Sequence, residues 1–276
     1  MGEGMGQYAL RDLERDDLAR LNAVKPDGWS DITAVHEHYL SVPNCRCVKA
    51  VDAGAGLAGI GTGISFTGTG WLAHIIVSKD HRRRGLGTMI VEDRIRCLRE
   101  GMGCGTITLT ATDDGYPLYR KVGFVDESLY AIFAKPEGRT FGDFGDARIV
   151  RVGERYLDGA LAIDRVTSGE DRAAFLRPLL KNGYAYVADG AVTGFYLPDF
   201  GDGGVSALTE EAGLALLGKR IRENKPVFVP VENGAARDFL VSMGYSEVKR
   251  IHRMILGSPF AREPGHCYSR LGGFAG

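Results

Sequence analysis

The sequence carries almost no net charge. Its 276 residues include 34 Lys and Arg against 35 Asp and Glu, which gives a formal net charge of −1. Nucleic acids and anionic membranes are bound through a large excess of cations, so this balance argues against both as main partners. No apolar run reaches the ~18 residues of a membrane-spanning helix, and the N-terminus lacks a signal-peptide pattern. We therefore expect a soluble, cytoplasmic protein.

Metal-binding and disulfide patterns are also missing. The chain has no CxxC pair and no metal-finger spacing among its five cysteines, Cys45, Cys47, Cys97, Cys104 and Cys267. Such a set is typical of reduced thiols in a cytosolic chain. His36 and His38 stand two residues apart and therefore do not share a helix face. No metal site is predicted.

Glycine, by contrast, is abundant. The 39 glycines are about twice the average usage, and they follow no period, which excludes a collagen-like chain. They indicate many tight turns and places where the backbone approaches something closely. The chain is long enough for two domains of about 100–200 residues each. Its 44% hydrophobic and 25% charged residues are typical of a folded globular chain.

The first half of the chain alternates between strand-like and helix-like patterns. The clearest strand, 71–78, is a nearly continuous apolar run, which is typical of a strand buried on both faces. The clearest helix begins near Gly85 and repeats apolar residues on one face as far as Met102. Further strands are predicted at 8–10, 46–52, 57–66, 106–111 and 124–134, and further helices over 11–22 and 114–122. This order favours an α/β fold with a mixed sheet that is parallel in part.

The second half repeats this pattern in part, after a Gly- and Asp-rich linker at 135–147. Strands are predicted at 184–188, 191–197, 227–231 and 245–256, and helices over 209–223, with Thr209 as its cap, and 234–243. When Gly123 is aligned with Gly244, Tyr119 stands opposite Leu240. We interpret the chain as two diverged copies of one fold, with domains at 1–134 and 148–276.

The segment 77–88, VSKDHRRRGLGT, lies between the apolar strand and the long helix. A helix N-terminus presents unpaired N–H groups at the positive end of the helix dipole. Gly85 and Gly87 remove side chains from this turn, and three arginines before them add charge. The pattern favours binding of a phosphate group. It is no Walker loop, because GxxxxGK[ST] does not occur, and no dinucleotide fingerprint, because the third glycine and the downstream acid are missing.

The motif Arg82-x-x-Gly85-x-Gly87-Thr88, placed after this strand, resembles motif A of the GNAT superfamily of acyl-CoA N-acyltransferases. The segment 117–124, PLYRKVGF, is similar to motif B of that family. The resemblance covers about residues 7–134. Residues 148–276 resemble a second GNAT domain of the kind found in the tandem YitH group. This domain is degenerate, because it lacks motif A and carries Leu240 in place of the tyrosine.

The resemblance implies that acetyl-CoA is the co-substrate and that the motif A turn binds its pyrophosphate. The implied contacts there come from Arg82, Arg83, Arg84, Gly85, Leu86, Gly87 and Thr88. The pantetheine arm is expected to pair with the strand backbone at Ile75, Ile76 and Val77. A neighbouring strand that splays away near Thr110 and Ala111 is expected to leave a slot for the thioester.

The resemblance also implies direct attack of a neutral amine on the thioester. Tyr119 occupies the family's position for the donor that stabilises the departing thiolate. The base is less defined, because this strand carries Ala73 and His74 where many relatives carry a glutamate. Either His74 relays a proton through water, or Asp113 or Asp114 receives it.

The acceptor pocket is expected in the segment after the first helix. Trp29 and His36 give this segment, 25–40, a mixed aromatic and polar character, and Asp113 is a further candidate for substrate binding. The second domain is expected to bind no CoA. Its Asp164-Arg165 pair and its tail, 267–276, are candidates to reach the acceptor site.

These features predict an acetyl-CoA-dependent N-acetyltransferase that acts on the primary amine of a small molecule or amino acid. Two alternatives stay open: a peptide or protein N-acetyltransferase, and a non-catalytic acyl-CoA-binding sensor. The pattern indicates neither the acceptor amine nor whether the chain is a monomer or a dimer.

Overall fold

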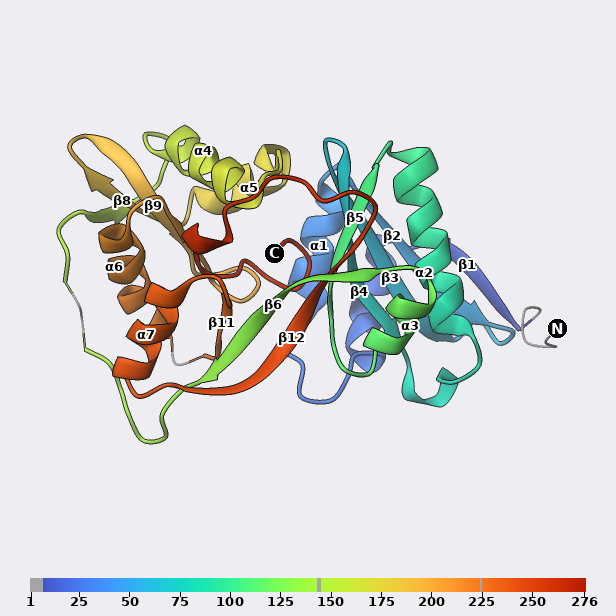
Figure 1. Cartoon of the computed structure of the whole chain (residues 1–276). Helices are drawn as coiled ribbons and strands as arrows, with labels where there is room; N and C mark the ends of the chain where they lie inside the picture. The colour runs from blue at the N-terminus through green and yellow to red at the C-terminus, as the bar shows by residue number, and fades with distance from the viewer. Residues whose placement is uncertain (1–6, 143–144, 224) are drawn as a thin grey trace. The chain divides into compact units, whose positions relative to one another are not determined.

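The computed structural model describes residues 7–142, 145–223 and 225–276, and its contacts divide them into two compact units (Figure 1). Unit 1 comprises the described residues up to Leu109, Gly115–Val125 and Ile255–Ser258; unit 2 comprises Thr110–Asp114, Asp126–Met254 and Pro259–Gly276. A short segment from each half of the chain, Thr110–Asp114 and Ile255–Ser258, therefore belongs to the unit formed mainly by the other half. The sequence predicted a single boundary at the linker 135–147. Residues 143 and 144 of that linker lie outside the described residues.

Unit 1 is built on a mixed sheet. Its strand order is β1-β2-β3-β4-β5, with bounds Tyr8–Asp12, Cys45–Asp52, Leu57–Phe66, Thr69–Val77 and Thr106–Ala111. The pairs from β1 to β4 are antiparallel, and β4 pairs with β5 in parallel. The predicted strands and the partly parallel sheet are confirmed.

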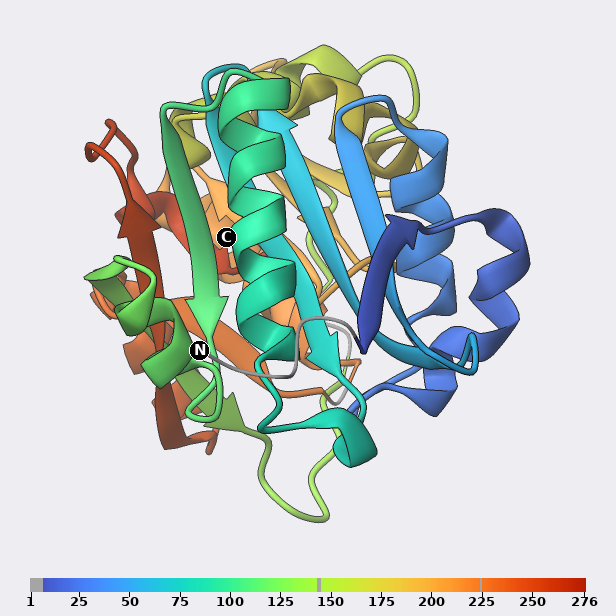
Figure 2. The same ribbon diagram turned by 90° about the vertical axis from the view of Figure 1, so that its right-hand side faces the viewer.

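Helices lie on both faces of this sheet (Figures 1 and 2). On one face α1 (Thr33–Ser41) contacts β2, and on the other α2 (Leu86–Arg96) contacts β3 and β4. A π-helical turn, Cys97–Gly101, continues α2. The short helix α3 (Tyr116–Lys121) has Pro117 in its first turn, as predicted.

The predicted helix over 11–22 needs correction. The structure has a 3-10 helix there, η1 (Arg15–Ala23), and not an α-helix. Leu18 and Leu21 stand three residues apart, a spacing that suits three residues per turn. Glu14 and Asp17 form a reciprocal capping box that sets its start.

Alternate glycines on β3 allow α2 to approach the sheet closely. A Cβ atom on Gly61 would lie 2.4 Å from Cγ2 of Ile90, and one on Gly63 would lie 3.1 Å from Cγ of Leu98. A side chain on Gly61 would clash with Ile90, and one on Gly63 would press on Leu98. Part of the glycine excess therefore serves helix–sheet packing.

The strands of unit 2 belong to two different sheets. β6 (Val125–Ala134) pairs antiparallel with β11 (Val227–Pro230) and neighbours β12 (Ser246–Leu256). A separate sheet has the order β13-β10-β9-β8-β7, with bounds Cys267–Ser269, Gly204–Ala207, Ala191–Leu197, Tyr184–Ala188 and Ile149–Arg151. The helices are α4 (Leu157–Ser168), α5 (Ala173–Leu180), α6 (Glu210–Ile221) and α7 (Gly234–Ser242). In the described residues no helix has the length and apolar character to cross a membrane.

The two halves of the chain share one type of helix ending. Gly123 after α3 and Gly244 after α7 have φ angles of +100° and +85°. The amide that follows each glycine donates back to the helix, to the Tyr119 carbonyl at 3.0 Å and to the Leu240 carbonyl at 2.9 Å. This is the left-handed glycine ending with its long-range return bond. It supports the alignment of the two halves as copies of one fold.

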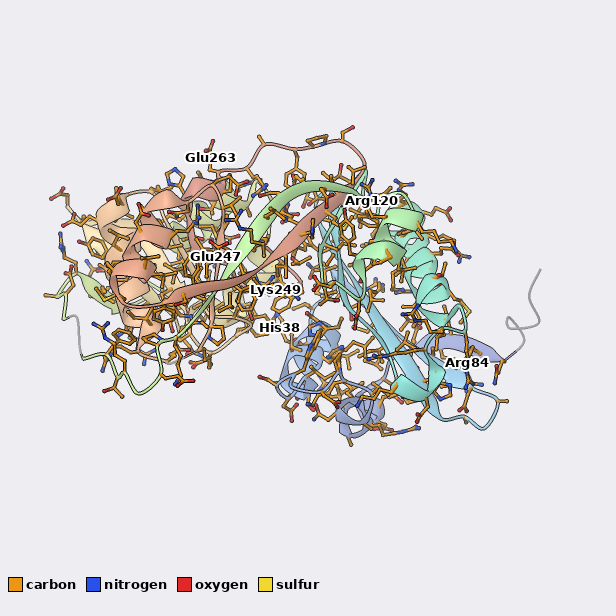
Figure 3. The ribbon with its side chains drawn as sticks, turned by 60° about the horizontal axis from the view of Figure 1, so that its bottom comes forward. His38, Arg84, Arg120, Glu247, Lys249 and Glu263 are labelled. Carbon is orange, nitrogen blue, oxygen red and sulfur yellow. The ribbon has the colours of Figure 1, made fainter. Side chains whose placement is uncertain are left out.

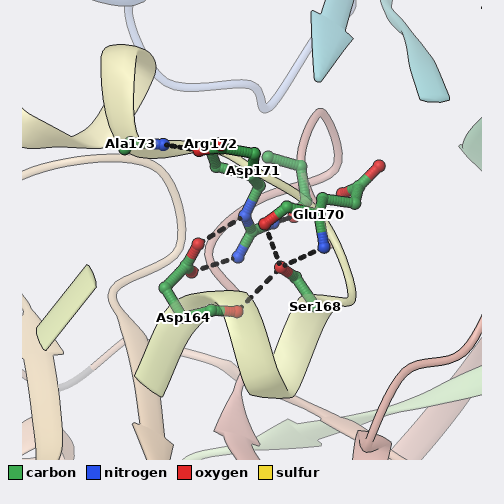
Figure 4. Close-up of polar contacts among 7 residues, drawn as sticks. Asp164, Ser168, Glu170, Asp171, Arg172 and Ala173 are labelled. Atoms are coloured by element: carbon green, nitrogen blue, oxygen red, sulfur yellow. Dashed lines mark hydrogen bonds and ion pairs between the residues drawn. The ribbon is translucent and has the colours of Figure 1, made fainter. Parts of the chain in front are cut away.

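A buried ion pair joins α4 to the residue before α5 (Figure 4). Arg172 donates to Asp164 from Nε at 3.0 Å and from Nη2 at 2.5 Å, and it also donates to the Ala275 carbonyl. Burial opposes the charge, but the Asp164 carboxylate raises the pKa of Arg172. The Asp164 carboxylate is therefore buried and paired with Arg172 within unit 2. This corrects the expectation that Asp164 reaches the acceptor site.

Removal of Asp164 tests this pair. Asp164→Ala leaves a buried guanidinium without its counter-charge, so we expect the free energy of unfolding to fall by about 3–5 kcal/mol. Asp158→Ala breaks an exposed pair with Arg177 and is the matched control, with an expected cost of at most ~1 kcal/mol. Urea denaturation measures both losses, and similar losses in the two variants would contradict the assignment.

Candidate active site

Strand β4 is irregular at one point. Between two regular pairs with β3, His74 and Ile75 together oppose the single residue Gly61. This arrangement is a β-bulge, which re-aims the side chains of the bulged strand. His74 has a φ angle of +47°, a conformation that costs a residue other than glycine about 1–3 kcal/mol. The alternation of the sequence gave no sign of this bulge.

Three aromatic side chains surround the His74 ring. The Tyr39 hydroxyl lies 3.1 Å from Nδ1 of His74. The ring centroids of His36 and Trp29 lie 4.9 and 6.1 Å from that of His74, both edge-on. The structure thus brings together three predicted site residues from β4, α1 and the loop before α1. The hydrogen bond of Tyr39 is an addition that sequence reasoning missed.

Burial keeps both imidazoles of this cluster neutral. It lowers the pKa of His36 to about 4 and, with the neighbouring His36 ring as a second cause, the pKa of His74 to about 3. Nδ1 of His36 lies 2.8 Å from the Ile32 carbonyl and carries the proton of that ring. Burial also raises the pKa of Tyr39, so its hydroxyl stays protonated. His74 itself keeps some exposure to solvent.

The predicted phosphate turn is open to solvent. Arg82, Arg83 and Arg84 are exposed, and Figure 3 places the Arg84 side chain at the turn before α2. Gly85 is the N-cap of α2 with φ +79°, and no side-chain oxygen caps the helix. The first amides of α2 are therefore left to an outside acceptor at the positive end of the dipole. Nε of Arg82 donates to the Val77 carbonyl at 3.2 Å, which ties the turn to β4.

Helix α3 packs beside the first turn of α2. A Cβ atom on Gly87 would lie 3.3 Å from Cδ2 of Leu118, so a side chain at this position would press on α3. The next residue, Tyr119, is 8% exposed, and its ring meets Phe124 edge-on. Burial raises the pKa of Tyr119, so its hydroxyl keeps its proton at neutral pH and can donate it. The phosphate turn and Tyr119 thus belong to one packed corner of unit 1.

Three other predicted site residues belong to unit 2. The parallel ladder between β4 and β5 ends at the pair Trp71–Thr108, before the bulge. The three residues of unit 2 are Thr110, Ala111 and Asp113. Asp113 forms an ion pair with Lys249 at 2.7 Å. Over the described ranges, no group of three or more His, Cys, Asp or Glu side chains is placed to hold a metal ion.

The corresponding helix of unit 2, α6, begins differently. The Thr209 side chain accepts from the Ala212 amide at 3.3 Å, as predicted, and Glu210 and Glu211 stand in the first turn. A cap and two acids thus occupy the place where α2 leaves its amides open. Leu240, aligned with Tyr119, is fully buried and has no hydroxyl to donate.

Comparisons with known proteins agree with this geometry. Residues 8–124 match the model of the acetyltransferase (GNAT) family. YitH of Bacillus subtilis, an uncharacterized N-acetyltransferase, is 22% identical over 210 residues, which cover 71% of this chain and 73% of YitH. A candidate acetyltransferase of Pyrococcus horikoshii has a TM-score of 0.80 at 22% identity, covering 100% of this chain and 97% of that one. A GCN5-related N-acetyltransferase from Sphaerobacter thermophilus has a TM-score of 0.62 at 14% identity, with 93% and 98% covered.

The fold is therefore that of known acetyltransferase structures, and the chain is an enzyme of the acyltransferase class. Residues 8–124 form a domain of the acetyltransferase (GNAT) family. This domain contains the bulge at His74, the open turn at Gly85 and the buried Tyr119. The resemblance stated from the sequence motifs is confirmed.

The neutral imidazoles predict a pH dependence. An unfolded imidazole binds a proton near pH 6.5, whereas His36 and His74 resist protonation down to about 4 and 3 in the fold. Below pH ~6.5 the unfolded state therefore binds more protons, and stability falls as the pH falls toward 4.

Imidazole NMR signals measured between pH 4 and 8 test this directly. We expect neither His36 nor His74 to titrate above pH ~5. Urea denaturation in the same pH range should show a smaller fall in the free energy of unfolding for His36→Phe than for the wild type. A midpoint near 6.5 for either ring would contradict the account.

Proposed function

We propose that the chain is an acetyl-CoA-dependent N-acetyltransferase that transfers the acetyl group to the primary amine of a small molecule or amino acid. The observation that carries the proposal is the uncapped N-terminus of α2, which lies beside α3 and its buried tyrosine. In the GNAT family such a turn receives acetyl-CoA. The chemistry belongs to residues 1–134, and 148–276 act as a degenerate second domain without a CoA site.

The residues of the turn fit a pyrophosphate. The amides of Leu86, Gly87 and Thr88 donate hydrogen bonds to its oxygens, and the exposed arginines at 82–84 add positive charge. Pairing of the pantetheine arm with Ile75, Ile76 and Val77 is supported by the end of the β4–β5 ladder before these residues. The slot for the thioester near Thr110 and Ala111 is proposed from the family resemblance alone.

Acetyl transfer needs a neutral amine, because an ammonium group has no lone pair. His74, beside Trp29 and His36 in the proposed acceptor pocket, is the candidate for the proton path. Its low pKa means that it passes the proton on to water and does not hold it. The forming C–N bond breaks the C–S bond and expels the CoA thiolate, and Tyr119 donates a proton to the sulfur. Tyr119 then regains a proton from water, which has taken up the one that the amine released. Asp113 remains the second candidate in the acceptor site.

Two other functions stay open to test. A peptide or protein N-acetyltransferase would use the same chemistry on a larger amine. A non-catalytic acyl-CoA sensor would keep the open turn but would not need a protonated tyrosine beside it. The buried Tyr119 therefore favours catalysis over sensing.

Gly85 provides a test of acetyl-CoA binding. Gly85→Glu places a side chain on a left-handed residue and a negative charge at the phosphate turn, so we expect the affinity for acetyl-CoA to fall by about tenfold or more. Gly101→Glu adds the same side chain at another exposed glycine with open space around it and should bind as the wild type does. Calorimetric titration with acetyl-CoA measures the affinity of both variants. Equal affinity would contradict the assignment of this turn as the acetyl-CoA site.

Tyr119 provides a test of catalysis. Tyr119→Phe keeps the ring but removes the donated proton, so we expect kcat to fall by about 10²-fold or more while acetyl-CoA still binds. Release of free CoA thiol across a panel of small amines, amino acids and peptides gives the rates. Unchanged turnover for every active amine would refute the role of Tyr119. Tight acetyl-CoA binding without any turnover on the panel would favour the sensor.

A further inference from the structure

Unit 2 contains a pocket that the proposed acetyl transfer does not use. Its volume is about 290 Å³, and it lies where the end of α6 meets β7, β8 and β9. The lining residues that matter here are Arg151, Tyr184, Tyr196, Lys219, Arg222 and Glu223. All of them belong to unit 2, so the pocket is defined within that unit alone.

Two cations from different elements meet on one ring in this pocket. The guanidinium carbon of Arg151, from β7, lies 4.2 Å from the ring centroid of Tyr184, and Nζ of Lys219, from α6, lies 4.1 Å from the same centroid. The two charges are therefore at most about 8 Å apart, within a Debye length. Arg222 adds a third cation to the lining.

A helix C-terminus alone does not explain this cluster. Cations near a helix end answer its dipole, which accounts for Lys219 and Arg222 on or just after α6. Arg151 comes from a strand, and its Nη1 is fixed by donation to the Asn182 carbonyl at 2.7 Å. In the described part of the chain, Lys219 has no carboxylate within ion-pair distance. Like charges are thus brought together, and among the described residues Lys219 faces the Tyr184 ring and the end of α6 without a carboxylate partner.

One of the two carboxylates that line the pocket is already engaged. Glu223 accepts a hydrogen bond from the Tyr196 hydroxyl and pairs with Lys225 at 3.3 Å. Asp199, the other acid of the lining, is exposed at the rim. Tyr184 and Tyr196 stack with their centroids 6.1 Å apart and give the pocket a flat aromatic wall. The lining therefore combines an excess of positive charge with an aromatic surface.

We propose that this pocket binds a small anionic molecule, whose carboxylate or phosphate group is held by Arg151 and Lys219 beside the Tyr184 ring. The site is separate from the phosphate turn of unit 1, whose arginines stand at the opposite kind of helix end, the N-terminus of α2. It gives unit 2 a ligand of its own, although this unit lacks the open helix start.

Calorimetric titration of the full chain tests the site. Inorganic phosphate and succinate serve as the two probes, at low ionic strength and in the Gly85→Glu background, so that the turn of unit 1 does not compete. We expect at least one probe to bind with a dissociation constant in the millimolar range or lower. Binding of phosphate alone, of succinate alone or of both identifies the acidic group that the site accepts.

Matched variants assign that binding to the pocket. Lys219→Met should weaken the bound probe about tenfold or more, whereas Arg177→Met, which removes an exposed cation elsewhere in unit 2, should leave it unchanged. Arg151→Gln, at an exposed position, repeats the test if Lys219→Met has a lower melting temperature. Binding of neither probe, or equal binding in Lys219→Met and Arg177→Met, would overturn the proposal.

Discussion

The candidate site of unit 1 depends on the start of one helix, α2. After β4 the chain passes through an arginine-rich turn, and Gly85 in the left-handed conformation starts α2 without a side-chain cap. A helix start without a cap leaves amides that need an outside acceptor, and the dipole makes an anion the favoured one. The rest of unit 1 holds this end in place. Arg82 ties the turn to the end of β4, and α3 packs against Gly87.

The second constraint is the bulge of β4. It sets His74 in a strained conformation, where the Tyr39 hydroxyl and the rings of His36 and Trp29 surround it. Burial in this cluster keeps both imidazoles neutral, which suits the proposed attack by a neutral amine. Unit 2 lacks these features at the positions that the glycine alignment makes equivalent. Its α6 is capped by Thr209, and Leu240 stands in the place of the tyrosine.

The sequence predicted the parts that local patterns determine. The bounds of β3, β5, β8 and β9 coincide with the predicted segments, because apolar and β-branched runs between glycine-rich turns mark strands clearly. The phosphate turn and Tyr119 were found because their spacing forms a motif. Helices α4 and α5 were missed. Gly159 and Pro178 lie inside them and weaken the helical signal, while packing of the first against Val192 favours the helix over local propensity.

Long-range features were outside the reach of sequence patterns. The contact between Tyr39 and His74 joins residues 35 positions apart, and the bulge depends on how β4 pairs with β3. The exchange of short segments between the two units is likewise a property of the folded chain, so a single boundary at the linker was the simplest prediction. The ion pair of Asp164 with Arg172 likewise depends on tertiary packing, whereas the sequence had made Asp164 a candidate to reach the acceptor site.

The most direct test of the central claim is an amide NMR titration of the full chain with CoA. If the open start of α2 binds the pyrophosphate, the largest shifts fall on the amides of Leu86, Gly87 and Thr88, and the amides at the capped start of α6 stay unchanged. Saturation with CoA while these three amides keep their positions would contradict the account.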